Sequence, residues 1–148
     1  VKIQPEKTQK ELIQEVIDRF FRIGPEITAM GFEPVFFGIH PTTMPEYWFS
    51  PDCPSNKQHP DMQPNWFEKG ISEERNNFCE IWNEYLQTVC ERNGIKFVSI
   101  YHHIVDKDNE PIQEFFLDPI HLNHDKCIHF IVEEFKKSGI DIMPREKQ

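Results

Sequence analysis

The sequence predicts an α/β domain built around a parallel sheet. Helical and strand-like patterns alternate along its 148 residues in the order helix, strand, helix, strand, helix. The strand-like patterns are short apolar runs bounded by Pro or Gly, which is typical of strands covered on both faces. Gly31 and Gly94 stand where a helical pattern gives way to a strand, and glycine favours such helix ends. This alternation favours parallel strands joined by helical crossovers.

The first helix is predicted to begin after Thr8. Thr8 and Glu11 have the spacing of a capping box, and apolar residues then recur at helical intervals as Leu12, Ile13, Val16, Ile17, Phe20 and Phe21. A proline at position 25 interrupts this helix and favours a further helical turn over 25–30. The apolar run 35–39 that follows predicts a strand buried on both faces.

Residues 41–70 are predicted to form a Pro- and aromatic-rich loop insertion in a single domain, 1–148. They hold six of the chain's twelve prolines, too many for a regular helix or a central strand. The aromatic side chains, Trp48 among them, indicate packing over the sheet edge, a substrate lid or a partner-binding surface. Cys53 lies in this polar loop and is expected to expose its thiol. The other cysteines occupy apolar helix positions and are expected to be buried, namely Cys79, Cys90 and Cys127.

The strongest helical pattern runs from Ser72 to about residue 93. Its apolar stripe consists of Phe78, Ile81, Trp82, Tyr85, Leu86, Val89 and Cys90. Residues 95–101 then predict a second strand, and 124–138 a last helix with Asn123 as its N-cap. Two strands are too few for a stable parallel sheet. We therefore expect an upstream segment or a partner chain to complete the sheet.

Composition narrows the classes of partner. The net charge is -9, so the chain offers no cationic surface for nucleic acid or for anionic membranes. No apolar run approaches the roughly 18 residues that a membrane-spanning helix needs. The cysteine spacing does not indicate a disulfide framework, which favours a reducing compartment and leads us to expect a cytoplasmic location.

The most specific segment is Asp118-Pro119-Ile120-His121. A carboxylate three residues before a histidine, on a turn stiffened by proline, can accept a hydrogen bond from one ring nitrogen and leave the other as a general base. Ligands of open α/β sheets bind beyond the carboxyl ends of the strands. His40 and Trp48 follow the first strand and are therefore candidate substrate-binding residues. His102 and His103 follow the second strand, and strand alternation would let at most one of them face a site.

This Asp-x-x-His block, followed by a capping residue and an amphipathic helix, resembles the last motif of SGNH (GDSL-type) serine hydrolases. The likeness extends over roughly residues 8–140, because the preceding helix, glycine and apolar strand also match that family's order. It implies the carboxyl-terminal part of a three-layer α/β/α, flavodoxin-like fold. It also implies hydrolysis or transfer of an acyl group, without metal or cofactor, on a small-molecule ester or acylated glycan. In such a triad Asp118 would be the carboxylate and His121 the base.

The other motifs of that family do not occur in the sequence. Neither Gly-Asp-Ser nor Gly-x-Asn-Asp is present, so the nucleophile and the oxyanion donors are expected upstream or on another chain. We accordingly expect the 148 residues alone to be inactive. A non-catalytic SGNH-like module that serves binding or assembly is the second class of function that we consider.

Other interpretations of Asp118, His121 and their neighbours compete with the catalytic triad. Asp118 can be a purely structural turn residue. His121, His124 and Asp125 have a spacing that can converge on a metal, although an acidic residue in a first helical turn also suits the helix dipole. An unrelated α/β protein with a metal or nucleotide site is the third class, and the sequence contains no Gly-rich phosphate loop to support nucleotide binding.

Overall fold

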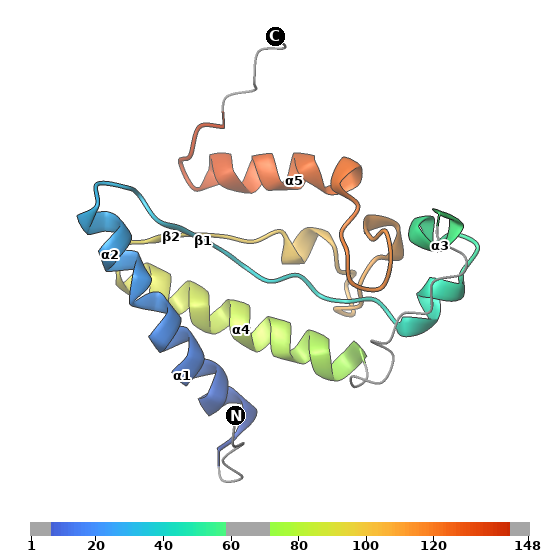
Figure 1. Cartoon of the computed structure of the whole chain (residues 1–148), viewed down its shortest axis with the longest axis horizontal. Helices are drawn as coiled ribbons and strands as arrows, with labels where there is room; N and C mark the ends of the chain where they lie inside the picture. The colour runs from blue at the N-terminus through green and yellow to red at the C-terminus, as the bar shows by residue number, and fades with distance from the viewer. Residues whose placement is uncertain (1–6, 59–71, 143–148) are drawn as a thin grey trace.

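Helices lie on both sides of a small parallel strand pair (Figure 1). The computed structural model describes residues 7–58 and 72–142. Strands β1 (Val35–Phe37) and β2 (Lys96–Val98) pair in parallel, with Val35 opposite Lys96. Helices α1 (Gln9–Phe21) and α4 (Ser72–Arg92) lie on one side of the strands and α5 (His124–Lys137) on the other. The α/β class and the predicted order of elements are confirmed.

Helix α1 begins as its sequence predicts. The Thr8 side chain accepts a hydrogen bond from the Glu11 amide, and the Glu11 carboxylate accepts one from the Thr8 amide, which completes the capping box. The short helix α2 (Ile23–Ala29) follows α1, and Gly31 lies just beyond its end with a φ of 86°. Glycine adopts this left-handed conformation at little steric cost. Within the described residues, no helix is long and apolar enough to cross a membrane.

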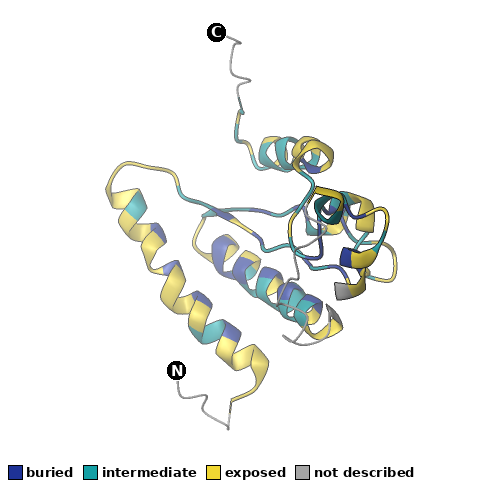
Figure 2. Cartoon of the chain, turned by 45° about the vertical axis from the view of Figure 1, so that its right-hand side comes forward, coloured by how far each residue is buried: buried dark blue, intermediate teal, exposed yellow. Residues whose placement is uncertain are grey.

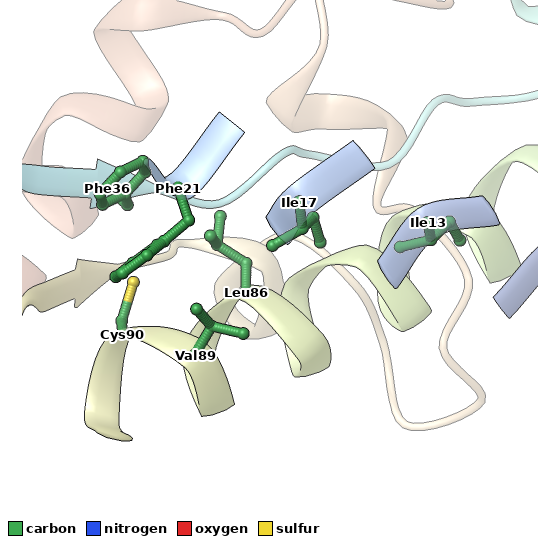
Figure 3. Packing of buried hydrophobic residues seen from close by; sticks show 7 residues of the cluster. All are labelled: Ile13, Ile17, Phe21, Phe36, Leu86, Val89 and Cys90. Atoms are coloured by element: carbon green, nitrogen blue, oxygen red, sulfur yellow. The ribbon is translucent and has the colours of Figure 1, made fainter. Parts of the chain in front are cut away.

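The first core cluster lies between α1, α4 and β1 (Figure 3). Its members are buried apolar side chains that the helical and strand patterns place on facing surfaces: Ile13, Ile17, Phe21, Phe36, Leu86, Val89 and Cys90. The ring of Phe36 stacks on Phe21 with their centroids 5.2 Å apart. On the other side of the strands, Phe37 stacks on Phe135 of α5. Burial of each such large side chain stabilises the fold by about 1.5 to 3 kcal/mol.

Both strands are shorter than the sequence predicts. β1 ends at Phe37 rather than at residue 39, and Phe37 is 40% exposed, so the expectation of a strand buried on both faces is wrong at this position. A side chain at Gly38 would collide with Asn83 and Ser99, because a Cβ atom there would lie 2.8 Å from Asn83 Oδ1. β2 likewise ends at Val98, and the chain then turns into a 3-10 helix, η3 (Tyr101–His103).

Two asparagines of α4 take over as hydrogen-bond partners where β1 ends. The Asn83 carboxamide accepts from the Ile39 amide at 2.8 Å and donates to the Ile39 carbonyl at 2.7 Å. Seven residues earlier, Asn76 accepts from the Thr42 amide at 2.8 Å and donates to the Thr42 carbonyl at 3.0 Å. Both asparagines are more than nine-tenths buried. They therefore keep residues 38–43 extended without a neighbouring strand.

The predicted loop insertion contains short helices and a second core. A 3-10 helix, η1 (Pro45–Phe49), and a short helix, α3 (Pro54–Gln58), each begin at a proline, which suits the first turn of a helix. The prediction that this segment lacks regular helix is therefore wrong for residues 45–58. Residues 59–71, including the aromatics at 66 and 67, lie outside the described part of the chain.

Four cysteines are buried, including one that was expected to be exposed. Cys53 has no exposed surface and belongs to the second core cluster, whose other members are Tyr47, Trp48, Ile100, Ile104, Phe116 and Cys127. The predicted exposed thiol at Cys53 is thus wrong, because the segment around it folds onto the chain after β2. The expected burial of the other three cysteines is confirmed.

We predict that Asn83→Ala destabilises the chain by about 2 to 4 kcal/mol, since it leaves the partly buried amide and carbonyl of Ile39 without their side-chain partner. Urea unfolding of the variant and the parent chain measures this loss. Asn77→Ala is the matched control, because Asn77 is an exposed asparagine of the same helix and its loss is expected to cost less than about 0.5 kcal/mol. Equal effects of the two substitutions would contradict the partner role of Asn83.

Candidate functional site

Asp118 organises the turn that carries His121. Its Oδ1 accepts hydrogen bonds from the amides of Ile120 and His121, both at 2.9 Å. The Leu117 amide donates to the His121 carbonyl at 2.8 Å and closes the turn. Pro119, between these groups, is fully buried. The structural interpretation of Asp118 as a turn residue is therefore correct for one of its two carboxylate oxygens.

The second carboxylate oxygen contacts the histidine ring. Nδ1 of His121 lies 2.8 Å from Oδ2 of Asp118 and 3.1 Å from Oδ1. An ionised carboxylate only accepts hydrogen bonds, so Nδ1 carries the proton in this contact and Nε2 is left as the basic nitrogen of a neutral ring. The Asp118 side chain is 8% exposed, whereas that of His121 is 67% exposed. The pair thus presents an oriented imidazole on a buried carboxylate.

The surroundings of Asp118 favour its ionised form. Burial acts to raise the pKa of this carboxyl, but hydrogen bonds from the Ile120 amide, the His121 ring and the His121 amide outweigh it, and the pKa lies below its ordinary value of 3.8. Asp118 is therefore ionised at neutral pH and can stabilise a positive charge on the ring of His121.

The segment after β1 fixes the turn in place. The Thr43 amide donates to the Pro119 carbonyl at 3.0 Å, which sets the turn beyond the carboxyl end of β1. The Ser55 amide and the Cys53 thiol both donate to the Leu117 carbonyl, and the Tyr47 hydroxyl donates to the Phe116 carbonyl. These contacts could not be predicted from residue types, because their acceptors are backbone carbonyls, which every residue carries.

Ser55 is the serine that approaches this pair. Its Oγ lies 3.4 Å from Asp118 Oδ2, so its hydroxyl donates to the carboxylate. A triad nucleophile instead bonds to the free nitrogen of the histidine. Among the described residues, no hydrogen bond joins Ser55 to His121. Ser55 is therefore placed to support Asp118 and is not placed as a nucleophile.

The two predicted substrate-binding residues, His40 and Trp48, differ in how they pack near the Asp118 turn. His40 is partly buried, its Nδ1 is 2.9 Å from the Pro41 carbonyl oxygen, and its ring centroid is 6.3 Å from that of Phe116. Trp48 is only 2% exposed and packs in the second core cluster. Trp48 therefore packs against residues that follow β2 and against α5, and its role in substrate binding stays a prediction. Neither residue contacts His121 among the described hydrogen bonds and ring contacts.

The start of α5 follows the expectation only in part. Asn123 occupies the N-cap position, but its side chain makes no capping hydrogen bond. His124 and Asp125 are exposed in the first turn. In residues 7–58 and 72–142, the ligand atoms of His121, His124 and Asp125 do not converge as a metal-binding group. The metal interpretation of this triplet is therefore not supported by the geometry.

The expectation that at most one of His102 and His103 faces a site is wrong. Both rings approach the same carboxylate oxygen, Oε1 of Glu134 in α5, at 3.5 Å and 2.8 Å from their Nε2 atoms. The alternation rule fails here because the chain leaves the strand at Val98 and turns into η3. The side chain of Glu134 is only 14% exposed.

No known family model and no curated protein sequence matches the chain. Two solved structures are similar to it in fold. One, from Bacteroides fragilis, is named a "putative acylhydrolase"; it is 12% identical, with a TM-score of 0.58, and the likeness covers 85% of this chain and 50% of that one. The other, from Streptococcus pneumoniae, is named a "putative platelet activating factor"; it is 15% identical, with a TM-score of 0.57, and the likeness covers 84% of this chain and 50% of that one.

The chain therefore spans about half the length of these two structures. At such low identity the likeness concerns the fold alone. What it establishes is that the strand pair and its helices are arranged as in part of a larger α/β protein.

The pH dependence of stability tests the carboxylate. Because the pKa of Asp118 is lowered on folding, its contribution is fully present above the unfolded value of 3.8 and is lost as pH falls through the lower folded value. We predict that Asp118→Ala costs about 2 to 3 kcal/mol at neutral pH. Relative to Asp118→Asn, the parent chain should lose its advantage below about pH 4. Urea unfolding between pH 3 and pH 7 measures both quantities.

Asp141→Asn serves as the matched control, since Asp141 is exposed near the end of α5. Its unfolding free energy should follow that of the parent chain across the same pH range. A pH-independent difference between the parent chain and Asp118→Asn would contradict the ionised, hydrogen-bonded state of Asp118.

Proposed function

We propose that this chain supplies the Asp–His half of a Ser-His-Asp triad in an esterase or acyltransferase of the SGNH type. The observation that carries the proposal is the contact of 2.8 Å between His121 Nδ1 and the buried carboxylate of Asp118. In this arrangement Asp118 holds the ring in one tautomer, and Nε2 of His121 takes a proton from the nucleophile and returns it to the leaving group.

Three further observations support the proposal. The turn lies beyond the carboxyl end of a parallel strand, where α/β proteins bind their ligands. The histidine ring is exposed while its carboxylate partner is buried. A general base needs such access, because its ring nitrogen has to reach the proton that it removes. The similar solved structure from Bacteroides fragilis is named a "putative acylhydrolase", so the proposed chemistry agrees with the name given to a protein of like fold.

The complete active unit has to include more than the residues described. We propose that a further segment or a partner chain adds strands beside β1, extends the sheet to a three-layer, flavodoxin-like fold and carries the serine. Within the described residues the strand pair has open edges. Much of α1 is coloured as exposed in Figure 2, and apolar residues of α1 and of the start of α2 are 37% to 52% exposed, namely Leu12, Val16, Phe20 and Ile23. Such an addition would cover both surfaces. The substrate would be a small ester or an acylated glycan that needs no metal or cofactor.

A non-catalytic SGNH-like module is the second candidate, and two observations favour it. The sequence contains no Gly-Asp-Ser and no Gly-x-Asn-Asp, and Ser55 bonds to the carboxylate rather than to the histidine. In that case the turn of Asp118 would be retained for folding, and the segment 41–58 would serve as a contact surface.

The isolated 148-residue chain is expected to show no esterase turnover, because its sequence lacks the Gly-Asp-Ser motif and, in residues 7–58 and 72–142, no serine hydroxyl hydrogen-bonds to His121. Hydrolysis of a p-nitrophenyl ester by the folded chain provides the measurement. Turnover above the uncatalysed rate that disappears in His121→Ala would contradict this expectation and would point to a nucleophile inside the chain.

In the active unit that contains the serine, His121→Ala is expected to lower kcat by about a thousandfold to ten-thousandfold. Covalent labelling of that serine by a fluorophosphonate should fall in parallel, since the reagent needs the activated hydroxyl. His124→Ala is the control, because His124 is exposed one helical turn away, and its activity should equal that of the parent. Failure of the reagent to label the active unit at all would favour the non-catalytic module.

A further inference from the structure

His102, His103 and Glu134 bring three metal-ligand atoms together away from the Asp118–His121 pair. Each offers one nitrogen or oxygen, and these atoms all lie within 4.8 Å of one another. The two histidines come from η3 after β2, and the glutamate comes from α5, so the group joins segments that lie 31 residues apart. Within residues 7–58 and 72–142, no other group of three His, Cys, Asp or Glu side chains converges in this way.

Two of the three ligands are held in position by packing. The His103 ring stacks on Phe130 with their centroids 4.4 Å apart and their planes 10° apart. Phe130 lies one helical turn before Glu134 on α5, so the same face of the helix supports both the ring and the carboxylate. The side chains of His103 and Glu134 are only 17% and 14% exposed. Such ordering in advance lowers the cost of arranging ligands around a cation.

The third ligand leaves the site open to solvent. The His102 side chain is 62% exposed, and its ring centroid lies 4.0 Å from that of His103. Two imidazole nitrogens and one carboxylate oxygen are a ligand set that zinc favours, and zinc sites with three protein ligands keep a fourth position for water.

The charges at this place suit a divalent cation. The carboxylate of Glu134 lies 2.8 Å from His103 Nε2 and accepts a hydrogen bond from Lys137 at 2.8 Å, so this oxygen already attracts positively charged and hydrogen-bonding groups. In the absence of a cation, Lys137 lies 2.8 Å from Glu134 Oε1 and also pairs with Glu133 at 2.9 Å. Because Lys137 is exposed and keeps that second partner, a cation can displace it from Oε1.

We propose that His102, His103 and Glu134 form a zinc site that ties the segment after β2 to helix α5. The ligands would be Nε2 of each histidine and the carboxylate of Glu134, with water in the remaining position. The site is independent of the proposed hydrolase chemistry. Its role is to brace α5, the helix that begins three residues after His121.

The experiment is calorimetric titration of the tag-free 148-residue chain with zinc chloride, together with thermal unfolding at each zinc concentration. The expected result is saturable binding of one zinc per chain and a rise in Tm with zinc, since a cation that binds the folded state stabilises it. The four cysteines are buried and do not compete in the folded chain. Magnesium at the same concentrations should leave Tm unchanged, because it prefers oxygen ligands.

Variants at the site decide the assignment. His102→Ala and Glu134→Gln should each weaken zinc binding at least tenfold and abolish the rise in Tm, whereas His129→Ala, at an exposed histidine of the same helix, should bind like the parent. His102→Ala removes an exposed ring and leaves the core intact, so it remains decisive if Glu134→Gln fails to fold. Cobalt should give visible absorption bands in the parent that are lost in His102→Ala. Absence of saturable zinc binding, or binding that His102→Ala leaves unchanged, would overturn the proposal.

Discussion

Side-chain amides of α4 hold the chain where β1 ends, and the candidate site depends on them. Asn83 and Asn76 each satisfy both backbone groups of one residue in the extended segment 38–43. A free strand edge would otherwise leave those groups to water or to another chain. Because the segment stays extended, Thr43 reaches the Pro119 carbonyl and sets the Asp118 turn beyond the strand. The packing of α4 therefore helps to determine where the imidazole of His121 lies.

Asp118 connects local folding with the proposed chemistry. One of its oxygens accepts two backbone amides of the turn, and the other contacts the histidine ring. A single ionised group therefore closes the loop and orients the base. The structural and catalytic interpretations of the Asp-x-x-His block are compatible, because one carboxylate serves both: Oδ1 accepts the two turn amides, and the ring Nδ1 lies closer to Oδ2, at 2.8 Å, than to Oδ1, at 3.1 Å.

The regular spacing of residue types in the sequence predicted the helices. It did not predict features that depend on contacts between residues far apart in the sequence. The capping box at Thr8, the stripe of α4 and the start of α5 follow from residue types at fixed spacings. The end of β1 depended instead on a close approach of Gly38 to Asn83 and Ser99. The burial of Cys53 depended on a fold-back of its segment onto Phe116 and Ile104. The pairing of His102 and His103 with Glu134 likewise joins residues that no local pattern relates.

The burial of the four thiols gives the chain internal reporters of its own motions. Burial raises the pKa of Cys79 and of Cys90 to about 11, and only the thiolate reacts quickly with alkylating reagents. Modification at each cysteine then requires a local opening of its surroundings. Cys90 would report separation of α1 from α4, and Cys53 would report release of the segment that supports the Asp118 turn. A comparison of the alkylation rates of Cys90 and Cys53 would therefore show which of these two regions opens more often.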